Sequence, residues 1–200
     1  MLRLVVLVSG HGSNLQAILD AIADGTLNAE VLAVVSNRGD AYALERAELA
    51  DITTAFVPLK PYREAGRPRE DYDRDLAELV ASFDPDWVVC AGWMHILSDP
   101  FLVRFPDHVI NLHPALPGEF PGKDAIGAAW EAAHRGMIMR TGCMVHVVTS
   151  VLDEGVVFAT AEVPVSATDS RDDIEERMHA AEHVLLVDVL RGLADRGEES

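Results

Sequence analysis

Hydrophobic positions along the chain alternate between strand-like runs and helix-like stripes. Leu2–Val8 is a run of leucines and valines, which is typical of a parallel strand covered on both faces. Leu15–Ala23 has helical spacing, which places its large aliphatic side chains on one face. The same patterns predict further strands at Glu30–Val35, Thr54–Val57, Asp86–Ala91 and His108–Leu112, and further helices at Ala41–Ala50, Arg69–Phe83 and Asp124–His134. The segment Pro58–Pro68, with prolines and a glycine, predicts a loop.

This succession of strands and helices predicts an α/β fold with a doubly wound, mostly parallel sheet and helices on both faces. The last third differs, because Gly142–Thr149 and Val156–Val163 are separated by only a short Asp-Glu-Gly connection. We expect these two strands to form an antiparallel pair at one end of the sheet. Ser170 then begins a long helix, and Ser170 with Asp173 loosely matches a capping box.

The length of 200 residues fits one domain, and we expect residues 1–200 to form it. The charged tail, roughly residues 193–200, is expected to fray. The sequence does not distinguish a monomer from a homodimer.

A formal net charge of -17 argues against nucleic acid and against anionic membrane surfaces as partners. The apolar N-terminus is too short to span a membrane and lacks a signal-peptide cleavage pattern, so we expect a cytoplasmic protein. The two cysteines, Cys90 and Cys143, lie in apolar runs without neighbours at metal-ligand spacing. The eight histidines form no His-Glu-x-x-His array, and we expect no metal.

The first candidate site is the turn Ser9–Asn14, where the first strand passes into a helix. Gly10 and Gly12 allow a tight turn, and the free amides and dipole of the helix start favour an anion there. The alternative is a structural βα turn with Ser13 as the N-cap. The third glycine of the dinucleotide fingerprint is missing, and Ser36-Asn37-Arg38 provides no acidic residue after the second strand. The turn therefore favours a phosphate monoester over NAD.

The second candidate site contains Asn111, His113 and Asp153. Asn111 and His113 face the same side of a buried strand because side chains alternate along it. The amide can donate to a developing oxyanion, and the imidazole can transfer a proton near neutral pH. The carboxylate of Asp153 would stabilise the imidazolium form if it lay nearby. The alternative is a polar strand end with a satisfied histidine and a turn aspartate.

Four motifs together resemble the phosphoribosylglycinamide formyltransferases, in the same order and spacing and over nearly the whole chain. The motifs are Gly10-His11-Gly12-Ser13-Asn14, Ala91-Gly92-Trp93-Met94-His95-Ile96-Leu97, Asn111-Leu112-His113-Pro114-Ala115-Leu116-Pro117, and Val145-His146 followed by Leu152-Asp153-Glu154-Gly155. The resemblance implies a formyltransferase-like fold. It also implies transfer of the formyl group of 10-formyltetrahydrofolate to the amino group of 5′-phosphoribosylglycinamide in de novo purine biosynthesis. The transfer would be direct, through a tetrahedral intermediate.

The resemblance further implies a role for each matching residue. Asn111 would stabilise the oxyanion, His113 would be the general acid, and Asp153 would support it and relay a proton through water. The phosphoribosylglycinamide would be bound by Gly12, Ser13, Asn14 and Glu182. The folate would be bound by Arg69, Met94, His95, Ile96, Leu97 and Asn111. His95 stands where bacterial members often carry Arg.

Other classes remain as alternatives. Formyltetrahydrofolate deformylase shares the Asn, His and Asp set but has an extra N-terminal domain. Methionyl-tRNA formyltransferase has an added basic C-terminal domain, whereas this chain ends in an acidic tail. A non-catalytic phosphate- or nucleotide-binding module would need the first candidate site but not the second. His146, which precedes Asp153 on a strand, is expected to have a supporting role.

Overall fold

A single seven-stranded sheet organises residues 1–198, the part of the chain that the computed structural model describes. Its strands lie in the order β3-β2-β1-β4-β5-β6-β7. Neighbours among β1 to β5 are parallel, whereas β6 is antiparallel to β5 and β7 is antiparallel to β6. The predicted mostly parallel sheet with an antiparallel pair at one end is confirmed. The strands are β1 (Leu2–Val8), β2 (Ala29–Ser36), β3 (Thr53–Phe56), β4 (Trp87–Cys90), β5 (Val109–His113), β6 (Arg140–Val147) and β7 (Val157–Pro164).

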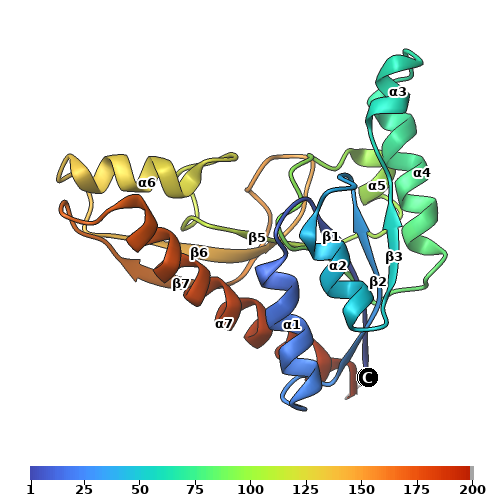
Figure 1. Cartoon of the computed structure of the whole chain (residues 1–200), viewed down its shortest axis with the longest axis horizontal. Coiled ribbons are helices and arrows are strands. Elements are labelled where there is room, and N and C mark those ends of the chain that lie inside the picture. Colours follow the sequence, from blue (N-terminus) through green and yellow to red (C-terminus); the bar gives the residue numbers. More distant parts are fainter. Residues whose placement is uncertain (199–200) are drawn as a thin grey trace.

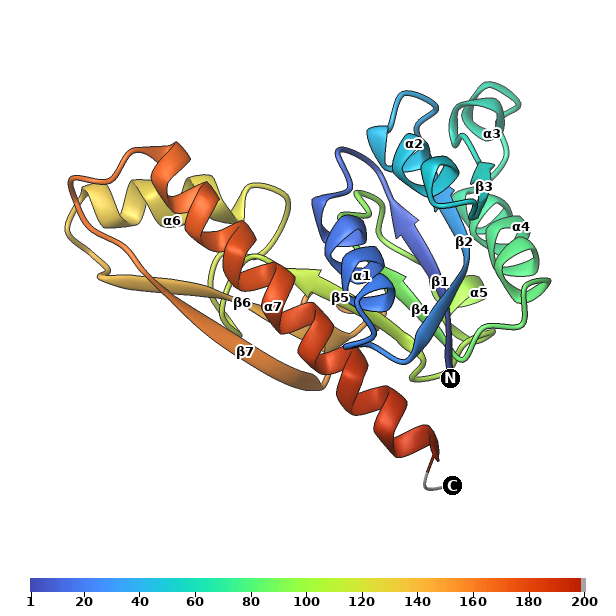
Figure 2. The same cartoon turned by 60° about the horizontal axis from the view of Figure 1, so that its bottom comes forward.

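Helices cover both faces of this sheet. On one face α1 and α7 lie side by side, and α7 runs diagonally past β6 and β7 (Figures 1 and 2). The other face is covered by α4 and α5, whose buried side chains pack against β1, β2 and β4. The helices are α1 (Ser13–Ala23), α2 (Tyr42–Leu49), α3 (Lys60–Glu64), α4 (Arg69–Ala81), α5 (Asp99–Leu102), α6 (Ala125–His134) and α7 (Arg171–Glu198).

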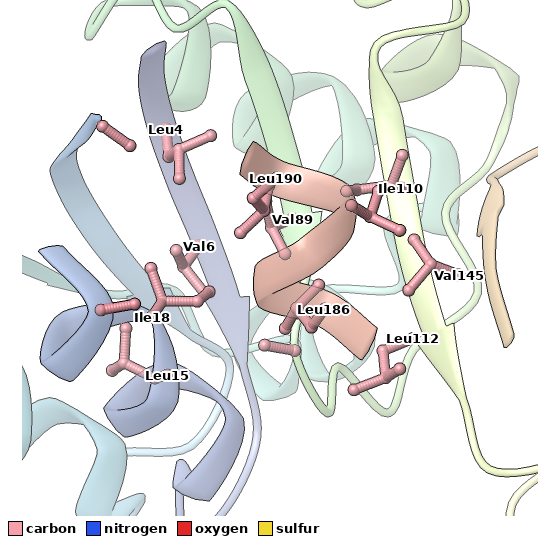
Figure 3. Packing of buried hydrophobic residues seen from close by; sticks show 14 of the residues in the cluster. Leu4, Val6, Leu15, Ile18, Val89, Ile110, Leu112, Val145, Leu186 and Leu190 are labelled. Carbon is pink, nitrogen blue, oxygen red and sulfur yellow. The ribbon is translucent and has the colours of Figure 1, made fainter. Parts of the chain in front are cut away.

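The central strand β1 contributes to the core on both faces. Leu4 and Val6 join the cluster beneath α1 and α7, whereas Val5 and Leu7 join the cluster beneath α4. Figure 3 shows the first cluster, in which Leu186 of α7 lies among side chains of the sheet. All four β1 residues are fully buried, and each such aliphatic side chain contributes about 1.5–3 kcal/mol. The apolar run, interrupted only by Arg3, therefore predicted this strand correctly.

Two short helices were not predicted. α3 lies inside the segment expected to be a loop, and α5 follows a loop after β4. α3 has five residues and buries none of them, and α5 has four residues and buries only Phe101. Helices this short carry no hydrophobic stripe, so periodicity does not reveal them.

The expectation of a frayed tail is wrong for residues 193–198. α7 continues through Gly192 to Glu198, and Leu193 and Ala194 are buried in the core beneath it. Asp195 and Arg196 are exposed, so the charged composition concealed the buried Leu193 and Ala194. Residues 199 and 200 lie outside the described residues.

The start of α7 has the predicted capping box. The amide of Asp173 donates to Ser170 Oγ at 3.2 Å, and the amide of Ser170 donates to Asp173 Oδ2 at 2.8 Å. These two bonds satisfy amides that the first helical turn leaves without partners. None of the helices in residues 1–198 has the length and apolar character needed to cross a membrane.

Candidate active site

A cavity of about 380 Å³ lies at the carboxyl ends of β4 and β5, next to α7. This is where open α/β sheets bind ligands. Nine of the residues singled out from the sequence line it: Asn14, Met94, His95, Ile96, Leu97, Asn111, His113, Asp153 and Glu182. Gly12, Ser13 and Arg69 do not belong to its lining. The structure therefore brings most of the predicted site residues together around one cavity. The turn Ser9–Asn14, called the predicted phosphate turn below, contributes Asn14 to the lining.

The candidate catalytic set is assembled by the antiparallel end of the sheet. Pairing of β5 with β6 places Asn111 opposite His146 and His113 opposite Met144. The connection after β6 then carries Asp153 back to both histidines. Asp153 Oδ2 lies 3.7 Å from His113 Nε2, and Asp153 Oδ1 lies 3.7 Å from His146 Nε2. Asn111, His113, His146 and Asp153 all line the same cavity, whereas Met144 does not.

His146 fixes the orientation of the Asn111 amide. Val147 O can only accept, so His146 Nδ1, 2.9 Å away, must carry the proton. In the neutral ring Nε2 is then an acceptor, and Asn111 Nδ2 donates to it at 3.2 Å. Burial lowers the pKa of His146, which favours this neutral form. One N–H of the Asn111 amide is thus engaged, which leaves its second N–H for a ligand oxygen.

The loop between β5 and α6 contacts the other two members of the set. His113 Nε2 lies 3.3 Å from Phe120 O, and the amide of Gly122 donates to Asp153 Oδ2 at 3.3 Å. His113 is only 4% exposed. The imidazole and the carboxylate are therefore held near each other, with 3.7 Å between Nε2 and Oδ2, which is longer than a direct hydrogen bond.

A second acid lies at the α7 side of the cavity. Glu182 is 5% exposed, and burial raises its pKa to about 7, although a hydrogen bond with the Asn14 side chain opposes that rise. A carboxyl group with such a pKa exchanges its proton near neutrality and can accept hydrogen bonds from an amino group once ionised.

The turn Ser9–Asn14 connects β1 to α1, as predicted, and its role in binding phosphate stays a prediction. The N-cap of α1 is Gly12, not Ser13, which is the first helical residue. Gly12 has φ +77°, in the left-handed region, and a Cβ there would lie 2.5 Å from the Cβ of Ala43. Only glycine fits this position, because both the backbone conformation and the close approach of α2 exclude a side chain.

Arg69 holds the loop after β4 from outside the cavity. Its guanidinium donates to both carboxylate oxygens of Asp73 and, at 2.6 Å, to Ile96 O. Asp73 is fully buried and also accepts from the amide and hydroxyl of Ser98. In this structure Arg69 therefore supports the loop of residues 92–98, and its contact with folate stays a prediction.

Sequence reasoning missed several of these supporting residues. Asp73 lies in a helix rich in charged residues, and nothing in the sequence distinguishes it from its charged neighbours. The Ser9 hydroxyl accepts from the amide of Met94 at 2.9 Å and donates to Asn37 Oδ1 at 2.6 Å. Asn37 Nδ2 lies 3.0 Å from His95 Nε2. These contacts join residues far apart in the chain, and no local pattern marks them.

An open α/β sheet whose carboxyl ends surround a cavity lined by amides, imidazoles and carboxylates is typical of a doubly wound protein that binds a polar small molecule. Within residues 1–198, no group of three or more His, Cys, Asp or Glu side chains is arranged to hold a metal ion.

Comparison with known proteins identifies the family. The family model described as "Formyl transferase" matches residues 2–190. A phosphoribosylglycinamide formyltransferase of Schizosaccharomyces pombe is 51% identical, over 94% of this chain and 94% of the relative. The one from Escherichia coli K12 is 40% identical, over 97% and 88%. The crystal structure of glycinamide ribonucleotide transformylase 1 from Symbiobacterium toebii has a TM-score of 0.90 and 37% identity, covering 98% of this chain and 88% of that one. The chain belongs to the formyl transferase family.

Proposed function

We propose that this protein transfers the formyl group of 10-formyltetrahydrofolate to the amino group of 5′-phosphoribosylglycinamide, a step of de novo purine biosynthesis. The observation that carries the proposal is the convergence of Asn111, His113 and Asp153 on one cavity, with Glu182 also in its lining. The names of relatives up to 51% identical over most of the chain support it.

The cavity suits the folate donor. Its volume of about 380 Å³ lies within the range of small-molecule sites. Met94, Ile96, Val151 and Leu152 line it and are about half exposed, so they offer apolar surface to a flat ring. The donor would supply the electrophilic formyl carbon.

In the proposed reaction the amino nitrogen attacks the formyl carbon. The free N–H of Asn111 donates to the formyl oxygen as negative charge develops there. His113 delivers a proton to the departing folate nitrogen, and the proton lost by the amine returns to the His113–Asp153 pair through a bridging water. Asp153 stabilises positive charge on the imidazole, and Glu182 accepts from the glycinamide end.

The compartment and the partners belong to the same proposal. Cys90 and Cys143 are both buried free thiols, and burial raises the pKa of each to about 12, so neither is a reactive thiolate. Unpaired cysteines are typical of a reducing compartment, which supports the cytoplasm. The net charge of -17 supports small-molecule substrates without nucleic acid or a membrane as partner.

The test measures formyl transfer through the change in folate absorbance, for wild type, His113→Ala and the control His108→Ala. His108 lies at the opposite end of β5, outside the cavity lining. We expect activity that requires both substrates, a loss of at least about a hundredfold in His113→Ala, and little change in His108→Ala. Folate turnover without the amine would indicate a formyltetrahydrofolate hydrolase. No turnover by a folded protein would indicate a binding module.

A further inference from the structure

Helix α2 packs against the turn Ser9–Asn14, the predicted phosphate turn, and binds its backbone. The amide of Ala43 donates to Gly10 O at 3.1 Å. One turn further along the same helix, Arg46 Nε donates to His11 O at 3.0 Å. Two successive carbonyl groups of the turn are therefore bound to α2, one by a backbone amide and the other by a guanidinium.

These two bonds also determine the direction of the neighbouring backbone N–H groups. In a trans peptide the C=O of one residue and the N–H of the next point in opposite directions. Fixing Gly10 O and His11 O towards α2 therefore turns the N–H groups of His11 and Gly12 away from it. The first amides of α1 follow directly, and helix starts leave these amides without intrahelical partners. Consecutive N–H groups that face one side form a concave site for an anion.

Arg46 is itself held in place. Its Nη1 donates to Gln16 Oε1 at 2.8 Å, and its guanidinium lies 4.8 Å from the centre of the Tyr42 ring. Gln16 belongs to α1 and donates in turn to Asp20 at 2.8 Å. The guanidinium thus connects α1, α2 and the turn, and it keeps a positive charge beside the turn in a protein whose overall charge is strongly negative.

We infer that Arg46 is a positioning residue that presets the predicted phosphate turn for a phosphate monoester by fixing the His11–Gly12 peptide. The inference rests on the proposed function, because it assigns the phosphate end of the amine substrate to this turn. Arg46 holds the turn through His11 O and Gln16, and the amides bind the phosphate.

Binding of inorganic phosphate tests this inference without any turnover. The ¹⁵N-labelled protein is titrated with phosphate, and the amide signals of Gly12 and Ser13 are followed in wild type, Arg46→Met and Arg38→Met. Arg38 lies in the neighbouring β2–α2 connection and pairs with Asp40, so its replacement removes the same charge without touching the turn. We expect Arg46→Met to weaken phosphate binding about tenfold, equivalent to about 1.4 kcal/mol, and Arg38→Met to weaken it less than about twofold.

Kinetics provide the second readout. In Arg46→Met we expect the KM for the phosphorylated amine to rise about tenfold, with kcat and the KM for the folate donor nearly unchanged. With the amine that lacks its 5′-phosphate, kcat/KM should equal that of wild type. Equal losses for the amines with and without phosphate, unchanged phosphate affinity, or a like loss in Arg38→Met would overturn the inference. Absence of formyl transfer by the wild type would refute the proposed function. The phosphate titrations would still show whether Arg46 is needed for phosphate binding at the turn.

Discussion

Replacing Glu182 with Gln is expected to stabilise the protein in neutral to alkaline solution. Burial raises the pKa of this carboxyl group from 4.5 to about 7. An acid whose pKa is raised by folding keeps its proton after the unfolded chain has lost it. The wild type therefore loses stability as the pH rises from 4.5 through about 7, whereas a glutamine of the same shape does not. Each pKa unit is worth about 1.4 kcal/mol, so the loss amounts to about 3 kcal/mol.

Urea denaturation of the two proteins at several pH values measures this difference. We expect the gap in free energy of unfolding to widen in favour of Glu182→Gln by about 3 kcal/mol between pH 4.5 and about pH 8. The exposed Glu176, on the same helix, provides the control, and Glu176→Gln should show little pH-dependent difference. A gap for Glu182→Gln that does not vary with pH would refute the reasoning from burial. The variant should also raise the KM for the amine, because a site residue held at a cost in stability is retained for binding.

Two further substitutions test the set around His113 and the loop after β4. Asp153→Asn should lower kcat far more than it weakens substrate binding, because asparagine tolerates the left-handed φ of 55° while removing the charge. Steady-state kinetics and binding measurements test this, and equal losses in kcat and binding would indicate that Asp153 mainly holds the fold. Asp73→Ala should cost about 3 kcal/mol of unfolding free energy, because Arg69 loses its buried partner. Asp75→Ala removes a partly exposed partner of Arg67 and Tyr62 and should cost about 1 kcal/mol; similar values for the two variants in chemical denaturation would contradict this.

The sheet could be predicted from the sequence because its strands carry their own signals. β1 is apolar on both faces, and that pattern is typical of a strand in a sheet that helices cover on both faces. The long helix α7 was predicted at its start, where Ser170 and Asp173 form the cap, but not at its end. Its last turns mix exposed charged residues with Leu193 and Ala194. The average polarity of these turns predicted a frayed end, whereas the position of the two apolar residues on one face of the helix indicates burial.

Only the part of the candidate site that lies on a single strand could be predicted from local sequence. Period-two alternation places Asn111 and His113 on one side, and that relation is independent of the rest of the fold. The approach of Asp153 depends on the antiparallel register of β5 with β6 and on a left-handed φ of 55° at Asp153 itself. The same register puts His146 opposite Asn111, so one long-range pairing determines both the carboxylate and the orientation of the amide.

The contacts that hold the loop after β4 and the turn before α1 could not be predicted from local sequence. Buried polar groups need partners, and those partners come from whichever segments the fold brings near. The buried Asp73 accepts from Ser98, and the carbonyl of the exposed His11 accepts from Arg46, so each partner comes from a different element. Both contacts fix a loop or turn beside the cavity rather than a reacting group. A single aspartate or arginine on a charged helix therefore becomes functional through the loop that it holds, and substitutions there should alter substrate affinity or stability before they alter the chemical step.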